Sequence, residues 1–122
     1  IAGKISWTYT DRKFPFMSAP AIDKTRVYIG CRDKNIHAIS REDGNGIWKY
    51  KTGGRVESSP LLFSNALVCG SSDGRLYAID LEKGEEIWRV DLGESIIAAP
   101  SFADGILLIG SEDGTLFALG EK

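Results

Sequence analysis

The sequence contains few of the residues that usually carry out chemistry. Its 122 residues include one histidine, one methionine and two cysteines. It has no nucleophile-elbow Gly-x-Ser-x-Gly, no phosphate-binding loop and no His-Glu-x-x-His zinc motif. No run of 18 apolar residues is present to suggest a transmembrane helix. The formal net charge of −2 gives no support for binding to nucleic acid or to an anionic membrane.

Helical periodicity is also missing, and a long repeat takes its place. No stretch free of glycine and proline shows apolar residues at the 3.6-residue spacing of a helix. The three tryptophans, Trp7, Trp48 and Trp88, are spaced by 41 and 40 residues. Four other residue types keep the same phase: Pro20, Pro60 and Pro100; Gly30, Gly70 and Gly110; Asp33, Asp73 and Asp113; Ala38, Ala78 and Ala118. A fixed period near 40 is typical of a repeat architecture.

Each repeat predicts four short strands. An apolar run that ends at the glycine is followed, after the aspartate, by a second apolar run, and the tryptophan lies in a third strand. Asp73-Gly74 and Asp113-Gly114 predict tight hairpins, and in the first repeat Asn35 is expected to supply the left-handed residue. A last strand is predicted just before the proline, at residues 55–59 and 95–99.

Four antiparallel strands per repeat predict an all-β chain built of β-propeller blades. The alternative is a β-sandwich or barrel, although its strands would not repeat residue types at every fourth strand. The predicted segments of this single domain are an outer strand of a split blade at 1–9, full blades at 14–50 and 54–90, and the first three strands of the split blade at 94–122.

The segment from Ala78 to Trp88 resembles the tryptophan-docking repeat of the pyrroloquinoline quinone (PQQ)-like propeller family. That pattern is Ala, any residue, Asp, three residues, Gly, three residues, Trp. The segment from Ala38 to Trp48 matches it with Ser40 in place of the aspartate, and Ala118 begins a third copy. The resemblance covers the whole chain. It implies a propeller, and its members include quinoprotein dehydrogenases, an outer-membrane assembly scaffold, and sensor proteins.

The resemblance implies structural roles for the repeated residues. The tryptophans are expected to wedge between blades beside the alanines and Gly44 or Gly84, since a large ring fits beside small residues. Each repeated aspartate is expected to accept backbone N–H bonds in its own turn, although a rim of carboxylates could also bind a cation. His37 is expected to lie on a strand face, where Tyr77 and Phe117 lie in the other repeats. No metal, cofactor or catalytic residue is predicted.

Three repeats are expected to be too few for a closed ring. The chain is therefore expected either to belong to a longer propeller or to pair head to tail with a second copy. In such a pair the second Trp7 would follow Trp88 by 41 residues, which matches the repeat. Two copies would then give six blades, with Trp7 buried against a last blade from the other copy.

Two further features leave alternatives open. The first repeat has one extra residue between its tryptophan and its proline, within a segment that contains Phe14, Phe16 and Met17. These side chains are predicted either to contact a partner or to fill the inner strand. Cys31 and Cys69 occupy different repeat positions, so a disulfide between them is not expected. Unpaired thiols favour a reducing compartment, whereas the resemblance favours the periplasm or the cell surface.

Three functions are compatible with these observations. The first is a non-enzymatic scaffold or recognition module for a protein or ligand, because a strong repeat fold occurs without a catalytic constellation. The second is a fragment of a PQQ-dependent dehydrogenase. However, this chain has no adjacent cysteine pair and no residues that match the quinone and calcium sites of those enzymes. The third is a ligand-sensing ectodomain.

Overall fold

The structure, a computed structural model, describes residues 2–120 and contains only strands, turns and loops in that range. The all-β expectation is therefore confirmed, and no helix in the described range could cross a membrane. Ile1 and residues 121–122, which belong to the predicted segments 1–9 and 94–122, lie outside the described residues. The strands are β1 (Ala21–Ile22), β2 (Arg26–Gly30), β3 (Asn35–Ser40), β4 (Gly46–Lys51), β5 (Leu61–Phe63), β6 (Ala66–Gly70), β7 (Arg75–Asp80), β8 (Glu86–Asp91), β9 (Ser101–Ala103), β10 (Ile106–Gly110) and β11 (Leu116–Gly120).

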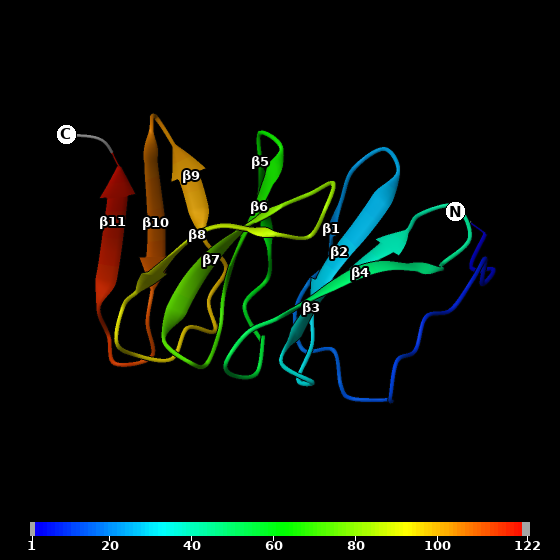
Figure 1. The fold of residues 1–122 in the computed structure, drawn as a ribbon, viewed down its shortest axis with the longest axis horizontal. Helices are drawn as coiled ribbons and strands as arrows, with labels where there is room; N and C mark the ends of the chain where they lie inside the picture. Colours follow the sequence, from blue (N-terminus) through cyan, green and yellow to red (C-terminus); the bar gives the residue numbers. More distant parts are fainter. Residues whose placement is uncertain (1, 121–122) are drawn as a thin grey trace.

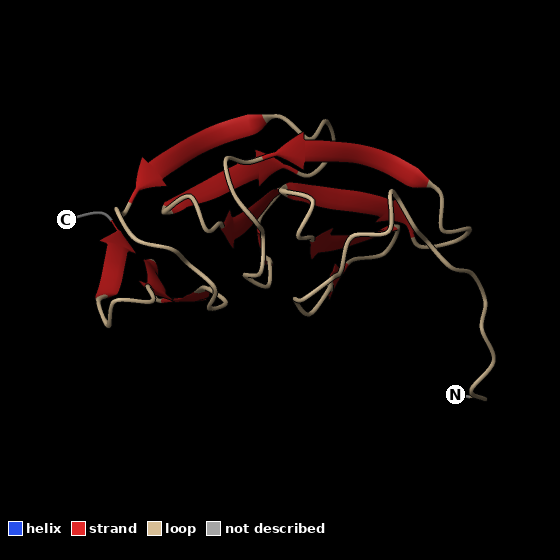
Figure 2. Cartoon of the chain, turned by 90° about the horizontal axis from the view of Figure 1, so that it is seen from below, coloured by secondary structure: helices blue, strands red, loops and turns tan. Residues whose placement is uncertain are grey.

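The strands form three antiparallel sheets that follow one another along the chain. The first has the order β1-β2-β3-β4, the second β5-β6-β7-β8, and the third β9-β10-β11. Figure 1 shows the sheets side by side along the long axis, with the two chain ends at opposite ends of the molecule. In the view of Figure 2, the N-terminal loop extends beyond the sheets. Each sheet is called a blade below, numbered in chain order.

The sequence repeat extends to the pairing of individual residues. Ala38 pairs with Trp48 across β3 and β4, and Ala78 pairs with Trp88 across β7 and β8. In both blades the register shifts directly after the alanine. A bulge at the same place in two blades indicates that the repeat specifies backbone geometry as well as composition.

The hairpin between the second and third strands turns through a left-handed residue in all three blades. That residue is Gly74 (φ 85°) in blade 2 and Gly114 (φ 90°) in blade 3. In blade 1 it is Lys34 (φ 76°), so the prediction that Asn35 supplies the left-handed residue is wrong. Asn35 instead begins β3 and donates a side-chain hydrogen bond to the Asp33 carbonyl at 3.2 Å.

The innermost strand lies after the proline, not before it. The predicted strands at 55–59 and 95–99 are wrong, and β5 and β9 take their place. The strands of the first two sheets lie between 21 and 51 and between 61 and 91. Val56 N–H donates to the Cys31 carbonyl of the preceding blade. The segment before the proline therefore bridges two blades and cannot pair within one sheet. Tight turns at Ser64 (φ 57°) and Asp104 (φ 52°) create the short hairpins instead.

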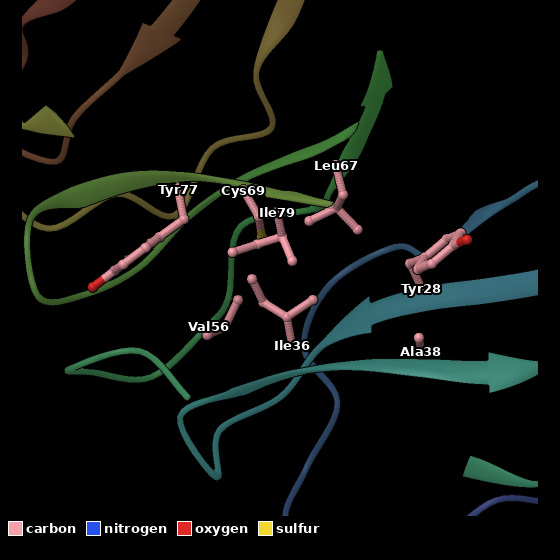
Figure 3. Packing of buried hydrophobic residues seen from close by; sticks show 8 residues of the cluster. All are labelled: Tyr28, Ile36, Ala38, Val56, Leu67, Cys69, Tyr77 and Ile79. Carbon is pink, nitrogen blue, oxygen red and sulfur yellow. The ribbon is translucent and has the colours of Figure 1, made fainter. Parts of the chain in front are cut away.

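The hydrophobic core lies between the blades. Tyr28, Ile36 and Ala38 of blade 1 face Leu67, Cys69, Tyr77 and Ile79 of blade 2, and Val56 lies between the two sets (Figure 3). The same arrangement recurs one repeat later, where Val68, Leu76 and Ala78 of blade 2 pack with Ile96, Leu107 and Ile109 of blade 3. Blade 2 therefore has two apolar faces, one for each neighbour.

Glycine at the end of the second strand allows the bridging residue to approach. A Cβ atom added to Gly30 would lie 2.3 Å from Val56 Cγ1, and one added to Gly70 would lie 2.3 Å from Ile96 Cγ2. No real Cβ contact is that short, so both glycines are required by the packing of Val56 and Ile96. The counterpart in blade 3, Gly110, has open space, with only the Thr115 carbonyl oxygen within 4 Å.

Candidate functional site

Trp48 reaches forward to the following blade. Its indole N–H donates to the Leu81 carbonyl at 2.9 Å, and a Cβ added to Gly84 would lie 2.5 Å from its ring. Gly84 also has a φ of 72°, which disfavours any other residue. The ring therefore closes over the turn between β7 and β8.

Trp7 occupies the same kind of site on blade 1. Its indole N–H donates to the Arg41 carbonyl at 2.8 Å, and its ring lies 2.6 Å from a Cβ added to Gly44. Within its own chain Trp7 therefore covers the turn of blade 1, and its contact with a blade of another copy stays a prediction. The tryptophan reaches forward to the next blade of its own chain, because the turn that receives it follows it in sequence.

Among the described residues, the N-terminal segment has no paired strand and the last tryptophan has no glycine turn to cover. Residues 2–10 pair with no strand among the described residues, so the predicted outer strand has no partner there. Trp88 is 40% exposed, and the described residues contain no counterpart of Gly84 for it. The repeated alanines also become exposed in the last blade: Ala38 and Ala78 are buried, whereas Ala118 is exposed.

Each repeated aspartate accepts a backbone N–H two residues further along its hairpin. The N–H groups of Asn35, Arg75 and Thr115 donate at 2.9, 2.9 and 3.2 Å to Asp33, Asp73 and Asp113, respectively. In blade 2 the carboxylate also accepts hydrogen bonds from the Tyr77 hydroxyl and from Gly53 N–H. These bonds hold the hairpin and leave Asp113, in blade 3, exposed to solvent.

His37 lies at the centre of a buried polar cluster. Its Nε2 is 2.9 Å from Asp33 Oδ2, and its Nδ1 is 2.9 Å from the Tyr9 hydroxyl. The Phe16 ring packs edge-on to the imidazole at 5.8 Å. The structure therefore places His37 on a strand face under aromatic rings, in a fully buried position.

Burial sets the charges in this cluster. Burial is the largest effect on His37 and lowers its pKa, while the Asp33 carboxylate only partly offsets that effect. Burial raises the pKa of Asp33, but the bond from Asn35 N–H and the neighbouring His37 together hold it below its ordinary value. At neutral pH the pair is therefore a neutral imidazole beside a carboxylate.

Cys31 joins the same cluster. The ligand atoms of Cys31, Asp33 and His37 all lie within 4.8 Å of one another, and all three residues are buried. Burial is the largest effect on the thiol and raises its pKa. The sequence predicted no such cluster, because five residues lie between Cys31 and His37 and only the hairpin brings the two side chains together.

The second cysteine lies elsewhere. Cys69 belongs to the core between blades 1 and 2, and its thiol donates to the Ser58 carbonyl at 3.2 Å. Complete burial raises the pKa of Cys69 to about 12. Both cysteines are free thiols.

The segment between Trp7 and Pro20, which holds the extra residue of the first repeat and is called the insertion loop, presents apolar side chains at the blade 1 end of the molecule. Phe14 and Met17 are exposed, and Phe16 is at the border of exposure at 36%. Met17 lines a cavity of about 220 Å³ with Glu57 and Ile97, the residues at its own position in the other two repeats. The three repeats therefore meet at this inner cavity.

Sequence reasoning missed Tyr9. Its hydroxyl bonds to His37, just as the Tyr50 ring packs on Tyr77 one blade later at 5.6 Å. The available signal was the phase, because Tyr9 and Tyr50 each follow a tryptophan by two residues.

Comparison with known proteins identifies the repeat. The sequence profile described as "Outer membrane protein assembly factor BamB" matches residues 2–85 and 33–122, and so covers nearly the whole chain. Among curated proteins, none matches the chain in sequence.

Solved structures with the same fold include BamB and two quinohemoprotein alcohol dehydrogenases. BamB from Moraxella catarrhalis superposes with a TM-score of 0.81 at 23% identity over 91% of this chain and 35% of its own. Quinohemoprotein alcohol dehydrogenase ADHIIG from Pseudomonas putida HK5 superposes with a TM-score of 0.85 at 23% identity, over 96% of this chain and 21% of its own. Quinohemoprotein alcohol dehydrogenase from Comamonas testosteroni superposes with a TM-score of 0.79 at 25% identity, over 88% of this chain and 19% of its own.

The chain spans about a third or less of the length of each of these three proteins. Their superposition confirms that the three sheets are β-propeller blades. The chain therefore belongs to the family of PQQ-like propeller repeats that includes the outer membrane protein assembly factor BamB.

Proposed function

We propose that this chain is a non-catalytic propeller segment that acts as a scaffold or recognition module and is completed by further blades. One observation carries the proposal. Leu108, Leu116 and Ala118 on blade 3 are exposed, although Tyr28, Ile36 and Ala38 at the same positions of blade 1 are buried against the next blade. An apolar face with this composition is typical of an association surface.

The opposite end of the stack carries the complementary face. Phe16 stands four residues before its proline, as Val56 and Ile96 do before theirs. Val56 packs on Gly30 and Ile96 packs on Gly70, while the space over Gly110 is open. Phe16 of a second copy would therefore meet Gly110, which supports head-to-tail pairing into a six-blade ring.

The solution mass of the chain tests pairing between copies. We expect about twice the monomer mass of 13.3 kDa at micromolar concentration. Leu116→Glu places a charge in the proposed contact and should give the monomer. Ile87→Glu is the matched control, because Ile87 is exposed on β8 and lies outside both end faces. A monomeric wild-type chain would reject a second copy as the completing partner and favour a longer propeller.

A fragment of a quinone-dependent dehydrogenase is the competing function, favoured by the superposition on two alcohol dehydrogenases. Against it, the described buried side-chain polar atoms all have hydrogen-bond partners, and Tyr28, Trp48, Tyr50 and Tyr77 are used in packing between blades. Titration with PQQ and Ca²⁺, followed by quinone absorbance, separates the two functions. Saturable binding would overturn the non-catalytic proposal.

The periplasm or the cell surface is the compartment that we propose, because the chain shares its repeat with BamB, which is described as an outer membrane protein assembly factor. A sensing ectodomain would also fit that compartment. Cell fractionation of the native protein tests the proposal, and recovery in the cytosol would contradict it.

A further inference from the structure

Two of the positions at which the hairpin of blade 1 departs from the other two hairpins carry metal-ligating side chains. Cys31 replaces Ser71 and Ser111, and His37 replaces Tyr77 and Phe117. The aspartate between them is common to all three repeats. Two separate departures from the repeat thus bring a thiol and an imidazole to the same carboxylate.

We propose that Cys31, Asp33 and His37 form a binding site for a divalent transition metal of the Zn²⁺ type. Thiolate, imidazole and carboxylate are the ligands that Zn²⁺ takes in proteins, at about 2.0–2.3 Å. Donors around one such ion lie roughly 3–4 Å apart. The three ligand atoms already lie within 4.8 Å of one another, so small side-chain movements bring them to a common ion.

The surroundings of His37 resemble those of a metal ligand. Ligating histidines usually donate their second ring N–H to an oxygen acceptor, which fixes the ring. Tyr9 supplies that oxygen, 2.9 Å from Nδ1, and the Phe16 ring packs against the imidazole. With the metal on Nε2, the ring proton sits on Nδ1 and donates to Tyr9. A water molecule would complete four-fold coordination.

The neighbouring hairpin shows what hydrogen bonding alone requires. In blade 2 the Tyr77 hydroxyl satisfies the same aspartate position, and Ser71 bonds to Thr52 at 2.9 Å. No thiol or imidazole is needed there to hold the turn. In blade 1, His37 makes the bond to the aspartate that Tyr77 makes in blade 2, and the Cys31 thiol donates to the Pro15 carbonyl at 3.4 Å. The turn does not require a thiol or an imidazole for these bonds, and Cys31 and His37 together provide the two ligand types that the other blades lack.

Arg12 is a positive charge close to the Asp33 carboxylate of the site. Its guanidinium is 4.0 Å from Asp33 Oδ2 and its side chain is largely exposed. It lies on the insertion loop, where Arg12 (φ 57°) and Lys13 (φ 60°) both adopt the left-handed region. Arg12 can swing into solvent when a metal binds, and its charge should weaken binding about fivefold at low salt.

Titration of the reduced chain with Co²⁺ tests the site. A bound thiolate gives an intense near-ultraviolet charge-transfer band, so we expect a band that saturates at one Co²⁺ per chain and disappears when Zn²⁺ is added. Arg12→Ala should tighten binding about fivefold. Absence of a saturable band in the wild-type chain would overturn the proposal.

Matched variants locate the ligands. Cys31→Ser and His37→Tyr install the residues of blade 2, so the hairpin should still fold. Cys31→Ser should abolish the band, and His37→Tyr should weaken binding at least tenfold. Cys69→Ile, which installs the residue found at positions 29 and 109, should leave the titration unchanged. A band that survives Cys31→Ser, or that is lost in Cys69→Ile, would refute the assignment.

A second readout covers a variant that fails to fold. In the wild-type chain, bound Zn²⁺ should slow the alkylation of Cys31 more than that of Cys69, as measured by peptide mass spectrometry, because ligation blocks the Cys31 thiol directly whereas Cys69 gains only from the stabilised fold. Equal labelling of Cys31 with and without Zn²⁺ would also refute the site.

Discussion

The face of blade 1 that packs against blade 2 and the outer face of blade 3 are built from the same repeat positions. The first is covered by a neighbouring blade and the second is exposed. Ile36 is fully buried in the interface, whereas Leu116, at the same repeat position, is 71% exposed. Trp48 closes over a glycine turn, whereas Trp88 has no such turn among the described residues. The comparison teaches that a blade's apolar face is completed by its neighbour, and that its own sequence does not decide whether that face is buried.

The largest expected effect comes from truncating the buried face. Ile36→Ala should lower the free energy of unfolding by about 3–4 kcal/mol, because it removes buried carbons and leaves a cavity. Leu116→Ala should change it by less than about 0.5 kcal/mol. Urea unfolding at a concentration where the chain is monomeric measures both values. Equal losses would contradict the difference between the two faces.

The tryptophans allow the same comparison with a smaller effect. Trp48→Ala should cost about 2–3 kcal/mol, since the half-buried ring and its hydrogen bond to the Leu81 carbonyl are lost. Trp88→Ala should cost less than about 1 kcal/mol. The two thermal unfolding midpoints provide the check. A larger loss at Trp88 would mean that its ring is covered in solution.

The smallest effect isolates the contact between a tryptophan and its turn. Gly84 (φ 72°) and Gly105 (φ 79°) are both left-handed, but only Gly84 has a ring against it. Gly105→Ala should cost about 1–2 kcal/mol for the backbone alone. Gly84→Ala should cost about 1–2 kcal/mol more, because its methyl group displaces Trp48. Chemical denaturation of both variants, and of Trp48→Ala combined with Gly84→Ala, measures the difference. In the double variant the additional cost should disappear.

The fold could be predicted from the sequence because the repeat acts at every level. The apolar runs beside Gly30, Gly70 and Gly110 became strands, and in blade 2 both faces of that strand pack against neighbouring blades. The hairpin aspartates also appear where their spacing predicted turns. The repeat period was enough to predict these strands and turns, and no long-range contact had to be known.

The innermost strand could not be predicted for a physical reason. β5 has three residues, which is too short to show alternation, whereas the segment before Pro60 carries the apolar Val56 and resembles a strand. Val56 is buried because it wedges between two blades, and composition does not distinguish a wedge from a strand. The turns at Ser64 and Asp104 were the overlooked signal.

The cluster around His37 was beyond sequence reasoning for another reason. Tyr9 and His37 are 28 residues apart, and they meet only because the N-terminal segment lies across blade 1. Single-residue departures from a repeat, such as Cys31 and His37, become informative once the hairpin shows that they share a neighbour.

The forward reach of the tryptophans has a consequence for how the chain is made. Trp7 precedes Gly44 and Trp48 precedes Gly84, so each ring is synthesised before the turn that it covers. When a new blade leaves the ribosome, the tryptophan that packs on its outer turn has therefore already been synthesised. Folding of such a stack can therefore proceed in the direction of translation, with each blade fastened as soon as its own turn emerges.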